Sequence, residues 1–167
     1  MLKVIILVVA TFIFIGCSSQ PLAKSQSEKQ IPEMFQSVKP EQVTLVQEGT
    51  LKNSCVRCGM NLTKFYKTSH TATYDDKNVQ YCSIHCLAEH LNEGVELKNP
   101  HVVDVTSLKL LPVLDVHYVV GSTKRGTMSR VSKYAFSNLE DAKKFQKENG
   151  GKIMDFYGAL KVAKEDF

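Results

Sequence analysis

The chain has 167 residues, with 21 Lys and Arg against 17 Asp and Glu, so its formal net charge at pH 7 is +4. This small excess is spread along the chain, which argues against the dense basic patch of a nucleic-acid-binding protein. We therefore expect no nucleic-acid partner. With 43% hydrophobic residues, the chain is long enough for one ordinary domain or two small ones.

The first 16 residues have the organisation of a lipoprotein signal peptide. Lys3 precedes an apolar run at 4–15, which is too short to span a bilayer comfortably and suits a signal peptide. The run leads into Cys17 in a segment that resembles a bacterial lipobox. Cys17 would then be the lipidated first residue, anchoring the chain at the periplasmic face of a membrane. Ser18 in place of Asp favours the outer membrane if the organism is Gram-negative. An ordinary signal peptide, or an uncleaved anchor with an incidental cysteine, is the alternative.

The segment that follows predicts a flexible tether. It is rich in Ser, Gln, Lys and Pro and holds few large apolar residues, so burial cannot offset the entropy lost on ordering. We divide the chain into a signal peptide (1–16), a tether (17–39), a first folded unit (40–110) and a second folded unit (111–167).

Hydrophobic periodicity and turn residues predict the elements of the first unit. Alternating residues flank an Asp-rich turn, which is typical of a hairpin. A later segment has leucines one helical turn apart between a Ser cap and a Gly stop. In chain order we expect a strand at 71–74, a turn at 75–78, a strand at 79–81, a helix from Ser83 to Gly94, and a strand at 101–106.

The second unit shows the same order of patterns. We expect a strand at 113–120, a loop at 121–130, a strand at 132–136, a helix capped by Ser137 and stopped by Gly150-Gly151, and a strand at 152–156. Each unit of about 50 residues would be marginal alone. We therefore predict an α+β fold in which two similar ββαβ units pack together and share a core.

Sulfur-bearing residues gather in two places in the first unit. The stretch 55–60 reads Cys-Val-Arg-Cys-Gly-Met, and Cys82 and Cys86 follow at a distance. Soft sulfur donors select Cu(I), zinc or iron–sulfur clusters over calcium or magnesium. Met60 favours Cu(I), because zinc rarely binds a thioether. Zinc remains the alternative, since four cysteines satisfy its tetrahedral coordination, and a metal-free disulfide framework with three possible pairings is another.

Two residues outside the cysteine pairs are further candidates. Met128 lies in a Gly- and Ser-rich loop with little apolar company, and His85 lies between Cys82 and Cys86. No nucleophile is paired with a base, so we do not expect an enzyme. A thiol–disulfide oxidoreductase is an alternative, although Gly59 follows Cys58 at once and no helix starts there. The candidate metal ligands are Cys55, Cys58, Met60, Cys82, Cys86, Met128 and His85.

The motif at 55–60 resembles the opening of the NosL family, the copper-binding accessory lipoproteins of nitrous oxide reductase assembly. The resemblance continues through 118–122, 126–128 and 135–136, then through Ala142, Phe145 and the glycine pair that follows. It implies two ββαβ units and a single Cu(I) site, with Met128 as a second thioether. It also implies delivery of copper to nitrous oxide reductase or its maturation complex.

The second cysteine pair departs from that family. Many relatives lack Cys82 and Cys86, and here the pair resembles a TRASH-type metal motif. Because Cys82 directly follows a predicted strand and Cys86 lies in the first turn of the predicted helix, we expect both thiols to return beside the loop at 55–60. The alternatives to a copper carrier are a structural or sensory lipoprotein domain held by zinc or disulfides, and the oxidoreductase.

Overall fold

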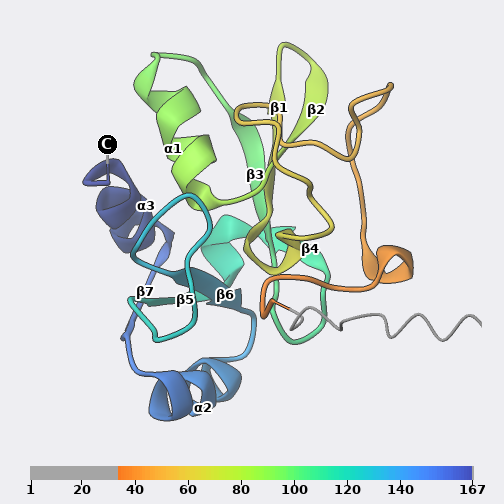
Figure 1. Cartoon of the computed structure of the whole chain (residues 1–167). Helices are drawn as coiled ribbons and strands as arrows, with labels where there is room; N and C mark the ends of the chain where they lie inside the picture. The colour runs from red at the N-terminus through yellow and green to blue at the C-terminus, as the bar shows by residue number, and fades with distance from the viewer. Residues whose placement is uncertain (1–33, 167) are drawn as a thin grey trace, which may run out of the picture. The chain divides into compact units, whose positions relative to one another are not determined.

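The computed structural model describes residues 34–166. The expected signal peptide, the lipidation site Cys17 and the tether up to residue 33 lie outside the described residues. Within 34–166 the chain forms two β-sheets and three α-helices (Figure 1), so the predicted α+β class is confirmed. None of these described helices combines the length and the apolar character needed to cross a membrane.

The predicted ββαβ order occurs twice. The first set is β1 (His70–Tyr74), β2 (Lys77–Tyr81), α1 (Ile84–Asn92) and β3 (Lys98–Val103). The second set is β5 (His117–Val120), β6 (Lys133–Phe136), α2 (Leu139–Asn149) and β7 (Lys152–Met154). Each set builds its own antiparallel sheet, and β4 (Leu110–Pro112) extends the first. The strand orders are β2-β1-β3-β4 and β6-β5-β7.

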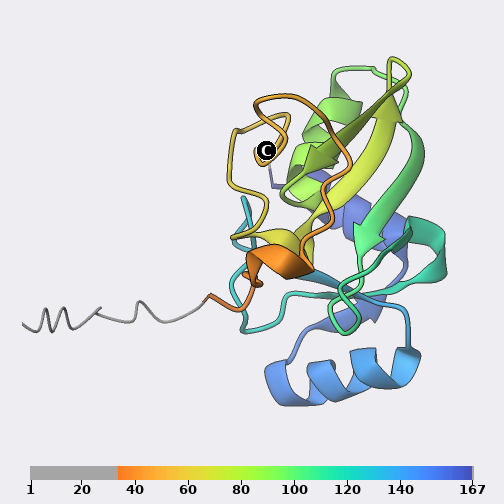
Figure 2. The ribbon, with the colours of Figure 1, turned by 90° about the vertical axis from the view of Figure 1, so that its right-hand side faces the viewer.

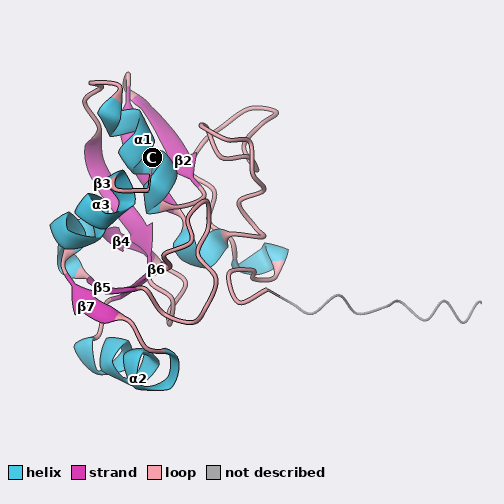
Figure 3. Ribbon diagram, turned by 60° about the vertical axis from the view of Figure 1, so that its left-hand side comes forward, coloured by secondary structure: helices cyan, strands magenta, loops and turns pink. Residues whose placement is uncertain are grey.

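A third helix, α3 (Phe156–Lys164), was not expected from the sequence. The strand predicted at 152–156 ends at Met154, because Asp155 starts a helix instead. Its side chain accepts a hydrogen bond from the Gly158 N–H at 2.8 Å, which is the usual N-cap contact. The new helix buries Ala159 and Ala163 and lies beside α1 (Figure 3).

Three smaller expectations were also wrong. The strand predicted at 101–106 is β3, which begins and ends three residues earlier. The strand predicted at 113–120 is shortened to β5, because Val113–Asp115 forms a short 3-10 helix. The N-cap of α2 is Asn138, whose side chain accepts from the Glu140 N–H, and not Ser137.

The second sheet is buried on both faces, which explains why the two units share a core. Tyr118 and Val120 on one face pack into the main core with the first sheet, α1 and α3. Val119 on the other face packs with Ala142 and Phe145 of α2. In Figure 2 the small sheet accordingly lies between α2 and the rest of the described chain. This arrangement leaves the start of α1 facing the loop between β5 and β6.

A fully buried histidine joins the two sheets. His70 Nδ1 lies 3.0 Å from the Thr68 carbonyl oxygen, which can only accept, so Nδ1 carries the proton. Its Nε2 therefore accepts from the Tyr118 hydroxyl, also at 3.0 Å. Burial disfavours the charged imidazolium and lowers the pKa of His70 to about 4, against the opposing effect of the Thr68 carbonyl. The histidine is therefore a neutral hydrogen-bonding part of the core.

Candidate metal centre

The four cysteines of the folded part converge on one point. Their sulfur atoms all lie within 4.8 Å of one another. The Cys58 and Cys82 sulfurs are 3.5 Å apart, and the Cys82 and Cys86 sulfurs are 3.7 Å apart. All four are free thiols. Cys58 is partly exposed and the others are buried, so the cluster lies just below the surface.

A closed loop carries the first two thiols. The Cys55 N–H donates to the Met60 carbonyl at 2.8 Å, and the Gly59 N–H donates to the Cys55 carbonyl at 2.9 Å. Gly59 has a φ of +73°, in the left-handed region that favours glycine. An added Cβ would meet no atom within 4 Å, so it is the backbone conformation that calls for glycine here.

The junction between β2 and α1 carries the other two thiols. Cys82 follows the last residue of β2, and Cys86 is the third residue of α1. The Cys82 carbonyl accepts from the Thr68 hydroxyl at 2.7 Å, which fixes the backbone where strand gives way to helix.

The thiols hold their protons unequally. Contacts with Cys82 and Cys86 lower the pKa of Cys55, against the opposing effect of burial. The contact with Cys55 raises the pKa of both Cys82 and Cys86, and burial adds to the rise. The cluster therefore forms one thiolate easily and resists forming the next. A bound cation would remove that resistance, because metal binding displaces thiol protons.

Two glutamines, which no sequence pattern reveals, hold the cysteine loop to β2: one is partly buried and the other fully buried. Gln80 is fully buried. Its backbone N–H donates to Gln47 Oε1 at 2.9 Å, and its carbonyl accepts from the Val56 N–H at 3.0 Å. Gln47 Nε2 in turn donates to the Ser54 carbonyl at 2.6 Å. No sequence pattern marks these residues, because glutamine is ordinarily a surface residue and the two glutamines that meet here are 33 residues apart.

The other three predicted ligands lie on three different parts of the chain. Met60 closes the cysteine loop and packs, partly buried, against the main core. His85 lies in the first turn of α1, between the two cysteines. Met128 is 42% exposed on a separate segment, residues 121–132 between β5 and β6, which we call the Met128 loop. The structure therefore gathers the four cysteines into one cluster and places Met128 on a separate element.

An open pocket of about 1040 Å³ lies beside the cysteine loop. Cys55, Val56 and Gly59 line one part of it, and residues 76–79, at the β1–β2 turn and along β2, line another. Cys55 is only 3% exposed, yet it forms part of the pocket wall. Among the four cysteines of the cluster, Cys55 alone lines this pocket.

Two comparisons with known proteins found a match. Residues 46–159 match the protein family described as NosL. The crystal structure of the copper chaperone NosL from Shewanella denitrificans is similar in fold, with a TM-score of 0.54 at 24% sequence identity. That match covers 71% of this chain and 96% of the other. No curated protein matches the sequence.

Proposed function

The chain belongs to the NosL family, and from that premise we propose that it is a Cu(I) carrier rather than an enzyme. It would work outside the cytoplasm, held to a membrane through Cys17, and deliver copper to nitrous oxide reductase or to the complex that matures its copper site. The proposals of this recipient and of the membrane anchor rest on the sequence resemblances. The metal-binding part of the proposal is supported by the structure.

One observation carries the metal-binding proposal: the four free thiols within 4.8 Å of one another. Thiolates are soft donors that bind Cu(I) well. Contacts with Cys82 and Cys86 lower the pKa of Cys55, which favours the thiolate form that a metal binds. The pocket beside Cys55 offers a way for a donor or recipient to reach the metal.

Anaerobic titration of the reduced protein tests the proposal directly. We expect one tightly held Cu(I) per chain, measured in competition with a chromophoric Cu(I) chelator. We expect the copper then to pass to copper-free nitrous oxide reductase. The recovery of that enzyme's copper absorption measures this transfer. A protein that loses its copper to a weak chelator, or that reduces insulin disulfides instead, would not be a copper carrier.

A structural zinc site is the second candidate, and the completeness of the thiol set favours it. Zinc–thiolate bonds of ~2.3 Å in a tetrahedron place neighbouring sulfurs roughly 3.8 Å apart. The two closest sulfur pairs, at 3.5 and 3.7 Å, are near that spacing. Challenge of the zinc-loaded protein with Cu(I) separates the candidates. A carrier releases zinc as one Cu(I) binds, whereas a structural site unfolds when its zinc is removed.

The proposed anchor depends on the thiol of Cys17, because acylation requires it. We expect a Cys17→Ser variant to remain an unprocessed precursor or to leave the membrane fraction. Fractionation followed by mass measurement checks this. A Cys17→Ser protein of mature size that stays with the membrane would contradict lipid anchoring.

A further inference from the structure

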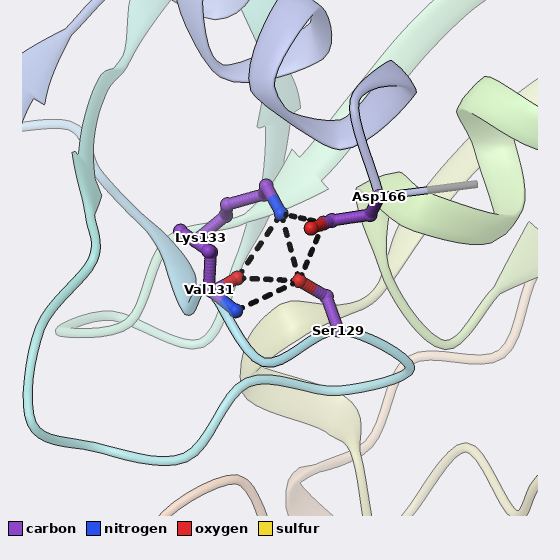
Figure 4. A network of polar contacts seen from close by, with 4 residues as sticks. All are labelled: Ser129, Val131, Lys133 and Asp166. Atoms are coloured by element: carbon purple, nitrogen blue, oxygen red, sulfur yellow. Dashed lines mark hydrogen bonds and ion pairs between the residues drawn. The ribbon is translucent and has the colours of Figure 1, made fainter.

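A compact polar network ties the Met128 loop to the end of the described chain (Figure 4). Asp166 follows α3, and its Oδ2 accepts from Lys133 Nζ at 2.6 Å and from the Ser129 hydroxyl at 2.5 Å. Lys133 Nζ also donates to Ser129 Oγ and to the Val131 carbonyl, both at 3.0 Å. All three hydrogens of the ammonium group thus have an acceptor.

The charged groups of this network are buried, which makes their full pairing necessary. The Lys133 side chain is 3% exposed and the Asp166 side chain 17% exposed. A charge at such depth is costly unless it is paired and hydrogen-bonded. Lys133 is the first residue of β6 and Ser129 belongs to the loop before it, so satisfying the buried ammonium fixes the course of the loop.

The Met128 loop is held in a conformation that its residues do not favour by themselves. Met128 has a φ of +59°, in the left-handed region that is unfavourable for a residue with a side chain. A Cβ added to Gly126 would lie 2.4 Å from the Ser129 carbonyl oxygen, so the turn closes on itself tightly. Strained backbone of this kind persists only where the surroundings hold it.

The other side of the loop contacts the segment between Cys82 and Cys86. Thr127 is buried, and its hydroxyl lies 2.8 Å from the Thr68 hydroxyl, which donates to the Cys82 carbonyl. Ser83 and His85 share a cavity of only about 10 Å³ with Thr127, Ser129 and Lys133. The residues on both sides of Met128 are thus packed closely against the cysteine-bearing start of α1.

We infer that Ser129, Lys133 and Asp166 are positioning residues that fix the Met128 loop against the cysteine-bearing start of α1. The inference rests on the proposed Cu(I) function, in which the thiolates set the affinity and the exposed Met128 thioether assists the exchange of copper. A thioether carries no proton near neutral pH, so it binds and releases Cu(I) without the proton exchange that a thiol needs. The Met128 thioether can speed copper transfer only if it is held in place, because misplacement of an assisting group slows a transfer step.

The experiment compares affinity with transfer rate in four variants. Equilibrium competition gives the Cu(I) affinity, and stopped-flow transfer to a chromophoric chelator gives the rate. We expect Asp166→Asn to slow transfer about tenfold while the affinity stays within a factor of about three of wild type. Met128→Leu should produce a similar slowing. Glu140→Gln, which removes one carboxylate from the exposed Glu140–Lys143 pair, is the matched control and should change neither quantity.

The double variant Met128→Leu with Asp166→Asn decides whether Asp166 acts through Met128. We expect it to be no slower than Met128→Leu alone, whereas a general structural defect would slow it further. Should Asp166→Asn unfold the protein, Lys133→Met with Asp166→Leu removes the network without leaving a buried charge, and the same comparison is made.

Each outcome bears on the inference. A slow Met128→Leu with a normal or additive Asp166→Asn would overturn the positioning role and leave the copper function intact. Wild-type transfer in Met128→Leu would overturn the inference as well, because the network would then position nothing used in exchange. If the wild-type protein itself did not bind Cu(I), the proposed function would be refuted instead.

Discussion

Replacing Cys58 by serine is expected to abolish tight Cu(I) binding. The Cys58 sulfur lies 3.5 Å from that of Cys82 and is the most accessible of the four. Serine keeps the shape of the side chain but offers no thiolate. Even partners outside the ligand sphere cost about 10–100-fold in metal affinity when they are lost, so removal of this thiolate should cost more than about 100-fold. Competition with a chromophoric chelator measures the loss.

Val56→Ser is the matched control for this variant. Val56 is 46% exposed on the same loop, so its replacement perturbs the loop without removing a sulfur, and the affinity should be retained. Cys82→Ser and Cys86→Ser should weaken binding or alter its stoichiometry. Undiminished affinity in the Cys58 variant would place the copper site elsewhere in the chain.

The second large effect concerns stability at low pH. The pKa of His70, lowered by burial from 6.5 to about 4, means that the unfolded chain takes up a proton below pH 6.5 that the folded chain refuses. His70 therefore supports the folded state fully above pH 6.5, and this contribution is lost as the pH falls toward 4. At ~1.36 kcal/mol per unit of pKa, the loss is about 3 kcal/mol.

Denaturant unfolding at a series of pH values checks this. The free energy of unfolding of His70→Phe should not show the part of the decline that His70 causes in wild type. The difference in this free energy between variant and wild type should therefore narrow by about 3 kcal/mol between pH 7 and 4. Tyr118→Phe is the control: it removes the hydroxyl that binds His70 but leaves the titrating imidazole, so the decline should remain. Parallel curves for wild type and His70→Phe would show that His70 is not held neutral.

The elements that the sequence predicted best are those specified locally. The β1–β2 hairpin is an example: Asp75 and Asp76 both adopt a positive φ, at 48° and 57°, as tight hairpin turns require. The helix α3 escaped prediction because Phe156, Tyr157 and Gly158 follow a strand-like run. Only the cap at Asp155 and the burial of Ala159 against the rest of the fold decide for a helix.

The candidate site divides in the same way. Its cysteines stand out in the sequence by chemistry and spacing, and the structure brings all four together. The residues that support them do not stand out. Gln80 and Thr68 act through hydrogen bonds to distant segments, and Asp166 becomes meaningful only when the end of the described chain meets Lys133. Such pairings depend on tertiary contacts and leave no periodic trace in the sequence.

The hydrogen bonds that hold the cysteine loop to β2 also affect how the protein behaves in concentrated solution. β2 is an edge strand of its sheet, and an edge with unpaired N–H and C=O groups is a template on which another chain can add a strand. Here Gln47 and the Val56 N–H occupy both backbone groups of Gln80. When the cysteine loop dissociates from β2, the unpaired backbone groups of this edge strand are therefore exposed to other chains. Keeping the thiols together and keeping the protein from aggregating depend on the same few contacts.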